Sequence, residues 1–285
     1  MKDRLSIKEF SQLSRIADST LRYWDKIDLF PPGIRSSRNR YRYYTPSQMI
    51  DVNYITVLSD LRVPLKTIIE TESSRTPAKI TDLLSRQEKV FDLEIRKLNE
   101  AHALVHTRRE LINEGMKAKV GDIAIRAMEE TPIVLGRPNI FRPGELFYLP
   151  LMRFREDASV LRVNLNFPIG GRYASMETFL DNPSQPERFF SVDPHGSAVI
   201  PADNYLVAYS QGYYGDFGDV PKKMADYARN HGFACVGSVY IVYLFDEVCE
   251  KDPSQYLSRV SVAVVPQEEL NAEPSDEYPG TDNLL

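Results

Sequence analysis

The chain has 285 residues, 42% of them hydrophobic, which is enough for about two domains with buried cores and too apolar for a disordered protein. It contains no run of 18 apolar residues, and its first ten residues, MKDRLSIKEF, lack an apolar core, so the sequence indicates neither a membrane span nor a signal peptide. Its two cysteines, Cys235 and Cys249, do not suggest a disulfide framework, and we expect a cytoplasmic protein.

The charge is unevenly distributed along the chain. The whole chain carries −5, a value that by itself argues against a nucleic-acid partner. However, residues 1–75 carry +4 and residues 76–120 carry +2, whereas residues 121–285 carry −11. This asymmetry is expected of a basic DNA-binding region joined to an acidic domain.

Residues 1–75 read as short helices and one β-ribbon. The capping signal SIKE at 6–9 begins a helix through about residue 13, and TPSQ at 45–48 begins another through about residue 61. Pro64 then opens a short helix through about residue 70. These signals predict a small helical domain with one ribbon between its helices.

The segment between these helices, residues 17–44, reads ADSTLRYWDKIDLFPPGIRSSRNRYRYY. It predicts a helix over 18–26, a break at Pro-Pro-Gly, and a two-stranded wing over 35–44 in which arginines alternate with tyrosines. A short helix followed by a basic aromatic wing indicates sequence-specific DNA binding. The residues that we expect to face DNA are Thr20, Arg22, Tyr23, Lys26, Arg38, Arg40, Tyr41, Arg42 and Tyr43, with Arg35 as a further phosphate contact.

Residues 76–120 predict one long helix that mediates dimerisation. Leu84, Phe91, Leu98, Val105 and Ile112 recur every seven residues, which is typical of a left-handed coiled coil. One small domain cannot cover so long an apolar stripe, so we expect a second copy of the chain. The alternative is a seam against residues 121–265 of the same chain.

Residues 121–265 have a different pattern. Short apolar runs separated by Gly, Pro, Asn and Asp predict strands at 133–135, 160–167, 205–209, 236–245 and 257–265, with helices near 144–151 and 221–230. This part reads as an α+β domain with a mostly antiparallel sheet. Residues 266–285 carry six acids and no base, and we expect a disordered tail.

Residues 5–120 resemble the MerR family of bacterial transcription regulators. Leu21-Arg22-Tyr23-Trp24-Asp25 is similar to the family's recognition-helix signature, residues 27–32 to the connection that follows, and residues 41–45 to the end of the wing. The resemblance implies a winged helix-turn-helix, an antiparallel coiled-coil homodimer and a near-palindromic operator. It also implies an activator that distorts the promoter spacer for RNA polymerase when an effector binds. Arg15 and Arg40 depart from it, because glycine is common at both positions.

Residues 121–265 more loosely resemble the GyrI-like domain, through the segments PADNYLVA at 201–208, GYY at 212–214 and GSVY at 237–240. With the first resemblance, this implies a regulator that binds small aromatic ligands, including multiple drugs. Aromatic side chains suit such ligands. The effector-binding candidates are Tyr148, Phe167, Tyr173, Tyr213 and Tyr240.

The charge of the effector is left open by the sequence. Ile241 and Arg259 stand where the resembling regulators have acids that anchor cationic drugs. A cation would therefore need another acid, and the candidates are Glu145, Glu177 and Glu247. An anion such as a cyclic dinucleotide is the alternative, with Arg153, Arg155, Arg162 and Arg172 as candidate partners.

We expect no cofactor, no metal and no catalytic site. His102 and His106 have the spacing of a helical metal pair, but no cysteine lies between residues 76 and 134 to complete a site. Two other functions remain open. Relatives of the GyrI-like fold include hydrolases, and an acidic domain could also bind a protein partner.

Overall fold

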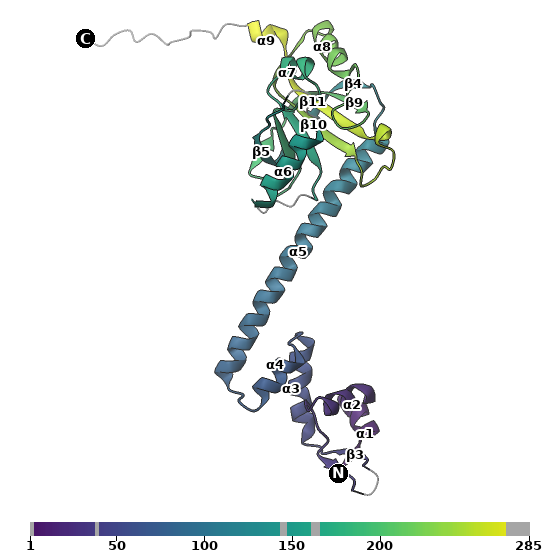
Figure 1. The fold of residues 1–285 in the computed structure, drawn as a ribbon, viewed down its shortest axis with the longest axis vertical. Coiled ribbons are helices and arrows are strands. Elements are labelled where there is room, and N and C mark those ends of the chain that lie inside the picture. Colours follow the sequence, from purple (N-terminus) through teal and green to yellow (C-terminus); the bar gives the residue numbers. More distant parts are fainter. Residues whose placement is uncertain (1–2, 38–39, 143–146, 161–165, 272–285) are drawn as a thin grey trace, which may run out of the picture. The chain divides into compact units, whose positions relative to one another are not determined.

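The computed structural model describes residues 3–37, 40–142, 147–160 and 166–271 (Figure 1). The chain divides into two compact units, residues 1–98 and 99–285. Among the helices of the described residues, none has the length and apolar character that a membrane span requires.

The first unit contains the short helices and the two-stranded wing predicted from the sequence, and an unpredicted strand, β1, extends the wing to a three-stranded sheet of order β1-β3-β2. Both pairs of strands are antiparallel, and the wing is the pair β2–β3, in which Arg35 lies opposite Arg42. The elements are β1 (Leu5–Ser6), α1 (Ile7–Ser14), α2 (Asp18–Lys26), β2 (Ile34–Arg35), β3 (Arg42–Tyr44), α3 (Gln48–Asp60) and α4 (Leu65–Glu72).

Local chemistry sets the ends of these elements. The Ser6 hydroxyl accepts a bond from the Glu9 amide at 3.3 Å, and the Glu9 carboxylate accepts one from the Ser6 amide at 2.8 Å, which is the predicted capping box of α1. Arg15 and Arg40 adopt the left-handed backbone, with φ of 59° and 56°. The turns therefore keep the geometry that glycine favours, at a cost of about 1–2 kcal/mol per residue.

An aromatic stack forms the centre of the first unit. The ring of Tyr44 lies 4.6 Å from that of Phe10 and 5.5 Å from that of Phe30, measured between centroids. Leu21 and Trp24 of α2 are buried in the same core. The stack joins α1, the segment after α2 and the wing, and with Leu21 and Trp24 it packs these elements around one core.

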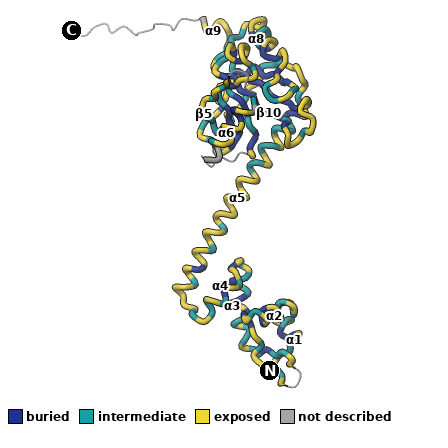
Figure 2. Tube along the Cα trace, viewed as in Figure 1, coloured by how far each residue is buried: buried dark blue, intermediate teal, exposed yellow. Residues whose placement is uncertain are grey.

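The predicted long helix is α5 (Pro77–Lys117), with 41 residues. Leu83 is buried in the core of the first unit, but most other apolar residues of the helix are exposed. Most of α5 accordingly has the colour of exposed residues in Figure 2. Leu98 and Val105 of the seven-residue repeat are 68% and 65% exposed, and Leu84 is 39% exposed. Phe91 and Ile112 are partly covered.

The second unit is built on an eight-stranded sheet of order β4-β9-β11-β10-β6-β7-β5-β8, in which every pair is antiparallel. This confirms the predicted α+β class. The strands are β4 (Ile123–Met128), β5 (Thr131–Pro138), β6 (Ile169–Tyr173), β7 (Arg188–Ser191), β8 (Ala198–Ile200), β9 (Asp203–Gln211), β10 (Phe233–Phe245) and β11 (Leu257–Pro266). The helices are α6 (Tyr148–Val160), α7 (Met176–Asp181), α8 (Val220–Asn230) and α9 (Gln267–Asn271), with a 3-10 turn at Pro253–Gln255.

Two predictions for this unit need correction. The helix expected near 144–151 begins at Tyr148 and continues to Val160, so Val160 ends a helix and does not begin a strand. Residues 267–271, which composition assigned to the tail, form α9. The acidic residues of this short segment are favourable at a helix N-terminus, and composition alone did not reveal this. Residues 161–165 and 272–285 lie outside the described part of the chain.

The sheet separates two apolar clusters. On one face, α7 and α8 cover Tyr173, Ile241 and Tyr243. On the other face, Tyr240 and Val242 are packed with Leu111 and Ala118 from the end of α5 and the residue after it. The alternation of side chains along β10 places consecutive residues in different clusters.

Candidate DNA-binding surface and effector region

Helix α2 presents the predicted reading residues to solvent. Its period buries Leu21 and Trp24 and leaves Arg22, Tyr23 and Lys26 exposed, with Tyr23 at 53%. Thr20 is partly covered. A helix that exposes a guanidinium, a phenol and an ammonium on one side is suited to base edges and phosphates in a major groove.

A buried carboxylate joins this helix to the wing. The Asp25 side chain is 2% exposed, and its Oδ2 accepts a bond from Arg42 Nε at 2.7 Å while Oδ1 accepts one from Arg35. One acid of α2 thereby holds an arginine of β2 and an arginine of β3. Arg35 and Arg42 were predicted as phosphate contacts. In the structure both are bound to Asp25, and these bonds hold the wing against α2. The role of Asp25 was missed, although its spacing of four residues from Leu21 puts it on the buried face.

The wing turn carries the other predicted contacts. The Ser36 amide donates to the Tyr41 carbonyl at 3.0 Å, and the Arg40 amide donates to the Ser36 carbonyl at 2.8 Å. Arg40 and Tyr41 are exposed, and the rings of Tyr41 and Tyr43 lie 5.3 Å apart. Arg38 lies outside the described residues.

The structure does not bring the five effector candidates together. Tyr173 is 1% exposed and its hydroxyl donates to the Pro183 carbonyl, while Tyr240 packs on Phe190 on the opposite face of the sheet. Burial raises the pKa of Tyr173 well above its ordinary value. Phe167 is also buried, Tyr213 is 45% exposed, and the side chain of Tyr148 is outside the described part. Their shared role in binding stays a prediction.

A different aromatic group surrounds Tyr214, and we call it the Tyr214 cluster. The Tyr214 ring stacks on Phe147 at 5.9 Å and meets Tyr243 edge-on at 4.5 Å, and its hydroxyl donates to Glu247. Burial, followed by the bond to Glu247, raises the pKa of Tyr214, so the phenol stays neutral and donating at ordinary pH. The other two members are Tyr213 and Tyr256, with rings 5.5 and 5.4 Å from that of Tyr214. Only Tyr213 was among the sequence candidates.

Glu247 is the acid that the structure places beside aromatic rings. It accepts from Tyr214, and its other oxygen lies 3.6 Å from a guanidinium nitrogen of Arg155. Of the three acids proposed from the sequence, Glu177 is exposed on α7, and Glu145 is outside the described residues. A cationic ligand that bound to Glu247 would therefore compete with Arg155 for this carboxylate.

The neighbouring residue, Asp246, holds the end of α5. Its Oδ2 lies 2.9 Å from Nη1 of Arg108, whose other nitrogens donate to the Asn166 carbonyl at 2.7 and 3.1 Å. Six residues after Arg108 on α5, Glu114 accepts a hydrogen bond from Arg259 at 2.6 Å and another from the Tyr209 hydroxyl at 3.2 Å. Between Asp246 and Glu247 there is a single peptide bond, so the aromatic cluster and the α5 anchor share one short segment.

The pair Glu114–Arg259 also explains a departure seen in the sequence. The position expected to carry an acid for cationic ligands carries Arg259, whose side chain is 13% exposed and bound to α5 through Glu114. This position therefore serves the attachment of the helix in this chain. Beside the same end of α5 lies a groove of about 700 Å³, whose apolar lining includes Leu104, Val105 and Val248. Among the described residues no group of three His, Cys, Asp or Glu side chains is placed to hold a metal ion.

Comparisons with known proteins agree with this geometry. Residues 5–74 match the family described as MerR HTH family regulatory protein. Over 254 residues the chain is 25% identical to the multidrug-efflux transporter 2 regulator of Bacillus subtilis (strain 168), covering 87% of this chain and 92% of that protein. It is 28% identical over 164 residues to the multidrug-efflux transporter 1 regulator of the same organism, covering 54% and 56%. Among solved structures it is similar to EcmrR in a cryo-EM complex with DNA, with a TM-score of 0.39, 17% identity, and coverage of 91% and 99%.

The exposed face of α2 and the wing fixed beside it define a helix-turn-helix DNA-binding protein. Residues 5–74 thus form a MerR-type helix-turn-helix domain, and along most of its length the chain is similar to a transcriptional regulator.

Proposed function

We propose that this regulator binds a near-palindromic promoter site as a homodimer and activates transcription when a small organic effector binds to residues 121–265. The observation that carries the proposal is the basic surface of α2 and the wing, held together by Asp25. Two such surfaces at a set separation would distort the spacer DNA between promoter elements, and the deformation would be offset by contacts from both copies.

The seven-residue repeat of α5 supports a specific dimer register. Leu98 lies at the middle of the set, with Phe91 and Val105 seven residues away on either side, and Leu84 and Ile112 fourteen residues away. An antiparallel pair centred on Leu98 would thus place Leu98 against Leu98, Phe91 against Val105, and Leu84 against Ile112 of the second copy. The exposure of Leu98 and Val105 leaves apolar surface that such a pairing would bury.

The effector site that we favour is the Tyr214 cluster with Glu247. Aromatic faces and a carboxylate suit a flat organic cation, and along most of its length the chain is similar to a regulator of a multidrug-efflux transporter. Such a ligand would displace Arg155 from Glu247. Because Asp246 follows the same backbone, movement of Glu247 would reach Arg108 and the end of α5.

An experiment on the full-length protein tests this proposal. The operator is first located by footprinting on the promoters next to the gene, and transcription is then measured in vitro with and without tetraphenylphosphonium as the probe cation. We expect dimeric protection of two half-sites, and more transcript with the probe for unmodified protein than for Glu247→Gln. Protection of a single half-site by a monomer, or equal transcript from both proteins at every probe concentration, would contradict the proposal.

A further inference from the structure

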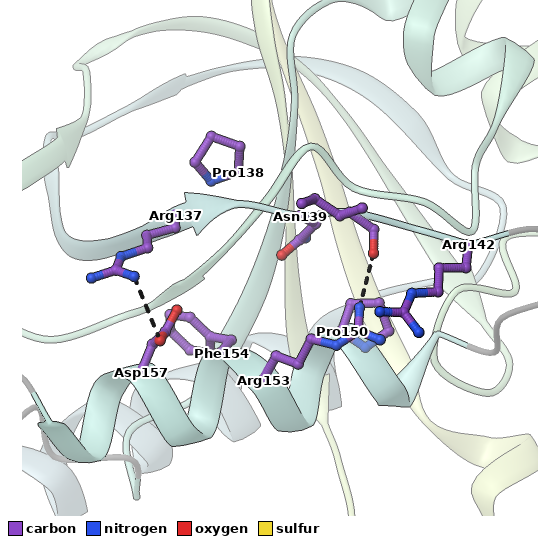
Figure 3. A pocket seen from close by; sticks show the side chains of 9 residues that line it. Arg137, Pro138, Asn139, Arg142, Pro150, Arg153, Phe154 and Asp157 are labelled. Carbon is purple, nitrogen blue, oxygen red and sulfur yellow. Dashed lines mark hydrogen bonds and ion pairs between the residues drawn. The ribbon is translucent and has the colours of Figure 1, made fainter.

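A second pocket of the C-terminal unit lies between the end of β5 and α6 (Figure 3). Its volume is about 340 Å³, within the range of about 300–1,000 Å³ that is usual for small-molecule sites. We call it the arginine pocket. Its lining residues are Arg137, Pro138, Asn139, Ile140, Arg142, Pro150, Arg153, Phe154 and Asp157. None of these residues belongs to the Tyr214 cluster.

The charge around this pocket reverses that of its surroundings. Residues 121–285 carry a net charge of −11, but the described lining contains three arginines and one acid, Asp157. The three arginines come from two separate segments, the strand end with its following loop and α6, and all of them border the same hollow (Figure 3). Three arginines around one pocket therefore contrast with the acidic charge of the rest of the domain.

The acid of the pocket is only weakly engaged. Asp157 Oδ1 lies 3.9 Å from Nη1 of Arg137, and these side chains are 43% and 75% exposed. Exposed pairs at this distance contribute little, so an anionic ligand could replace the carboxylate beside Arg137 at small cost. At the other end, Arg153 Nη1 donates to the Ile140 carbonyl at 2.9 Å, which holds this guanidinium at the rim (Figure 3).

The wall of the pocket is apolar and held in place. Phe154 is 6% exposed, and it packs on Phe189 and against Gly136, where an added Cβ would lie 2.5 Å from the Phe154 ring. The loop after β5 is hydrogen-bonded to residues 186–187 of the same chain. The Asn139 amide donates to the Glu187 carbonyl at 2.7 Å, and the Asn139 side-chain nitrogen donates to the Pro186 carbonyl at 2.9 Å. The hollow is thus formed before any ligand arrives.

We propose that the arginine pocket binds a small amphipathic organic anion. The apolar or aromatic body lies on Phe154 and the proline rings. The anionic group lies between Arg153 of α6 on one side and Arg137 of β5 and Arg142 of the following loop on the other. This site is additional to the Tyr214 cluster, and it gives the regulator a second ligand of opposite charge.

The test uses two probes with one shared body, naphthalene-2-sulfonate and naphthyl-trimethylammonium, titrated calorimetrically into the full-length protein. For the sulfonate we expect saturable binding that weakens about tenfold in Arg153→Gln, because a charge-assisted contact is lost. The same affinity should rise in Asp157→Asn, a gain that misfolding cannot produce. Arg229→Gln, which changes an exposed arginine of α8, is the matched control and should leave the affinity unchanged.

The ammonium probe separates the two sites. The affinity of the ammonium probe for the protein should not fall in Arg153→Gln, because Arg153 carries the same charge as this probe. This holds wherever the ammonium probe binds, including at the Tyr214 cluster. The proposal is overturned if the sulfonate shows no saturable binding, if Arg153→Gln and Asp157→Asn bind it as the unmodified protein does, or if Arg153→Gln weakens both probes equally.

Discussion

Replacing Asp25 by asparagine tests how the DNA-binding surface is held together. The carboxylate is 2% exposed and contacts Arg42 at 2.7 Å as well as Arg35. Asparagine keeps the shape but removes the charge and turns an NH₂ group toward one of the two guanidiniums. The arginines are 27% and 50% exposed, so water replaces part of the lost interaction. We therefore expect a loss of about 1–3 kcal/mol in the free energy of unfolding of the N-terminal unit.

The direction in which Asp25→Asn changes DNA affinity distinguishes a direct effect of charge from an effect on the position of the wing. Removal of a negative charge should by itself strengthen binding to a phosphate backbone. If Asp25 fixes the wing against α2, Asp25→Asn should instead weaken operator binding, by about tenfold or more. The measurement is fluorescence anisotropy on the footprinted operator at fixed salt, together with thermal unfolding.

The matched control is Asp28→Asn. Asp28 is exposed, three residues further on, and has a φ of 57°, which asparagine accepts. This variant removes the same charge without removing a buried contact, so we expect unchanged or slightly tighter binding. If Asp25→Asn binds the operator as tightly as Asp28→Asn does, the reasoning about the wing is refuted.

Three further predictions concern reading, assembly and signalling. Arg22→Ala should cost about 1–3 kcal/mol on the operator and less on unrelated DNA, which competition binding measures; an equal loss on both would make Arg22 a phosphate contact. Leu98→Asp should give a monomer by light scattering, whereas Leu13→Asp, at a similarly exposed site on α1, should not; if both variants stay dimeric, the interface lies elsewhere. Asp246→Asn should keep effector affinity but reduce the transcriptional response, because the bond to Arg108 is weakened; an unchanged response would remove this segment from the signal path.

The N-terminal fold was readable from sequence because its signals are local. The capping box at Ser6 and Glu9, the Pro-Pro-Gly break and the alternation of the wing each act within a few residues, and the structure follows them. The contact between Asp25 and Arg42 spans 17 residues, and it depends on how the wing folds back. The burial of Asp25 and its bonds to Arg35 and Arg42 were therefore not predicted from the sequence.

The effector region was less predictable because its residues meet through loops and strand register. Tyr240 and Tyr243 differ by three positions in β10, so the alternation of a strand already places them on opposite faces. In contrast, Tyr214 and Glu247 are 33 residues apart and both lie beyond strand ends. Neither periodicity nor composition locates such a pair. Of the aromatic candidates chosen by type, Tyr173 and Tyr240 lie in different cores and Tyr213 is 45% exposed.

The attachment of α5 suggests how an effector could act at all. A ligand shifts an equilibrium only by the difference between its affinities for two states, and couplings of about 1–3 kcal/mol correspond to about 5–150-fold. In this chain the end of α5 is held by Asp246 and by Arg259. Arg259 is fixed within the sheet, whereas Asp246 precedes Glu247, which the proposed cation would take from Arg155. The contact with Arg259 is therefore independent of the ligand, whereas the contact with Asp246 lies next to it. If the ligand weakens only the Asp246 contact, the end of α5 stays attached through Arg259 and can rotate about that point. If the ligand weakened both contacts, the end of the helix would detach from the sheet.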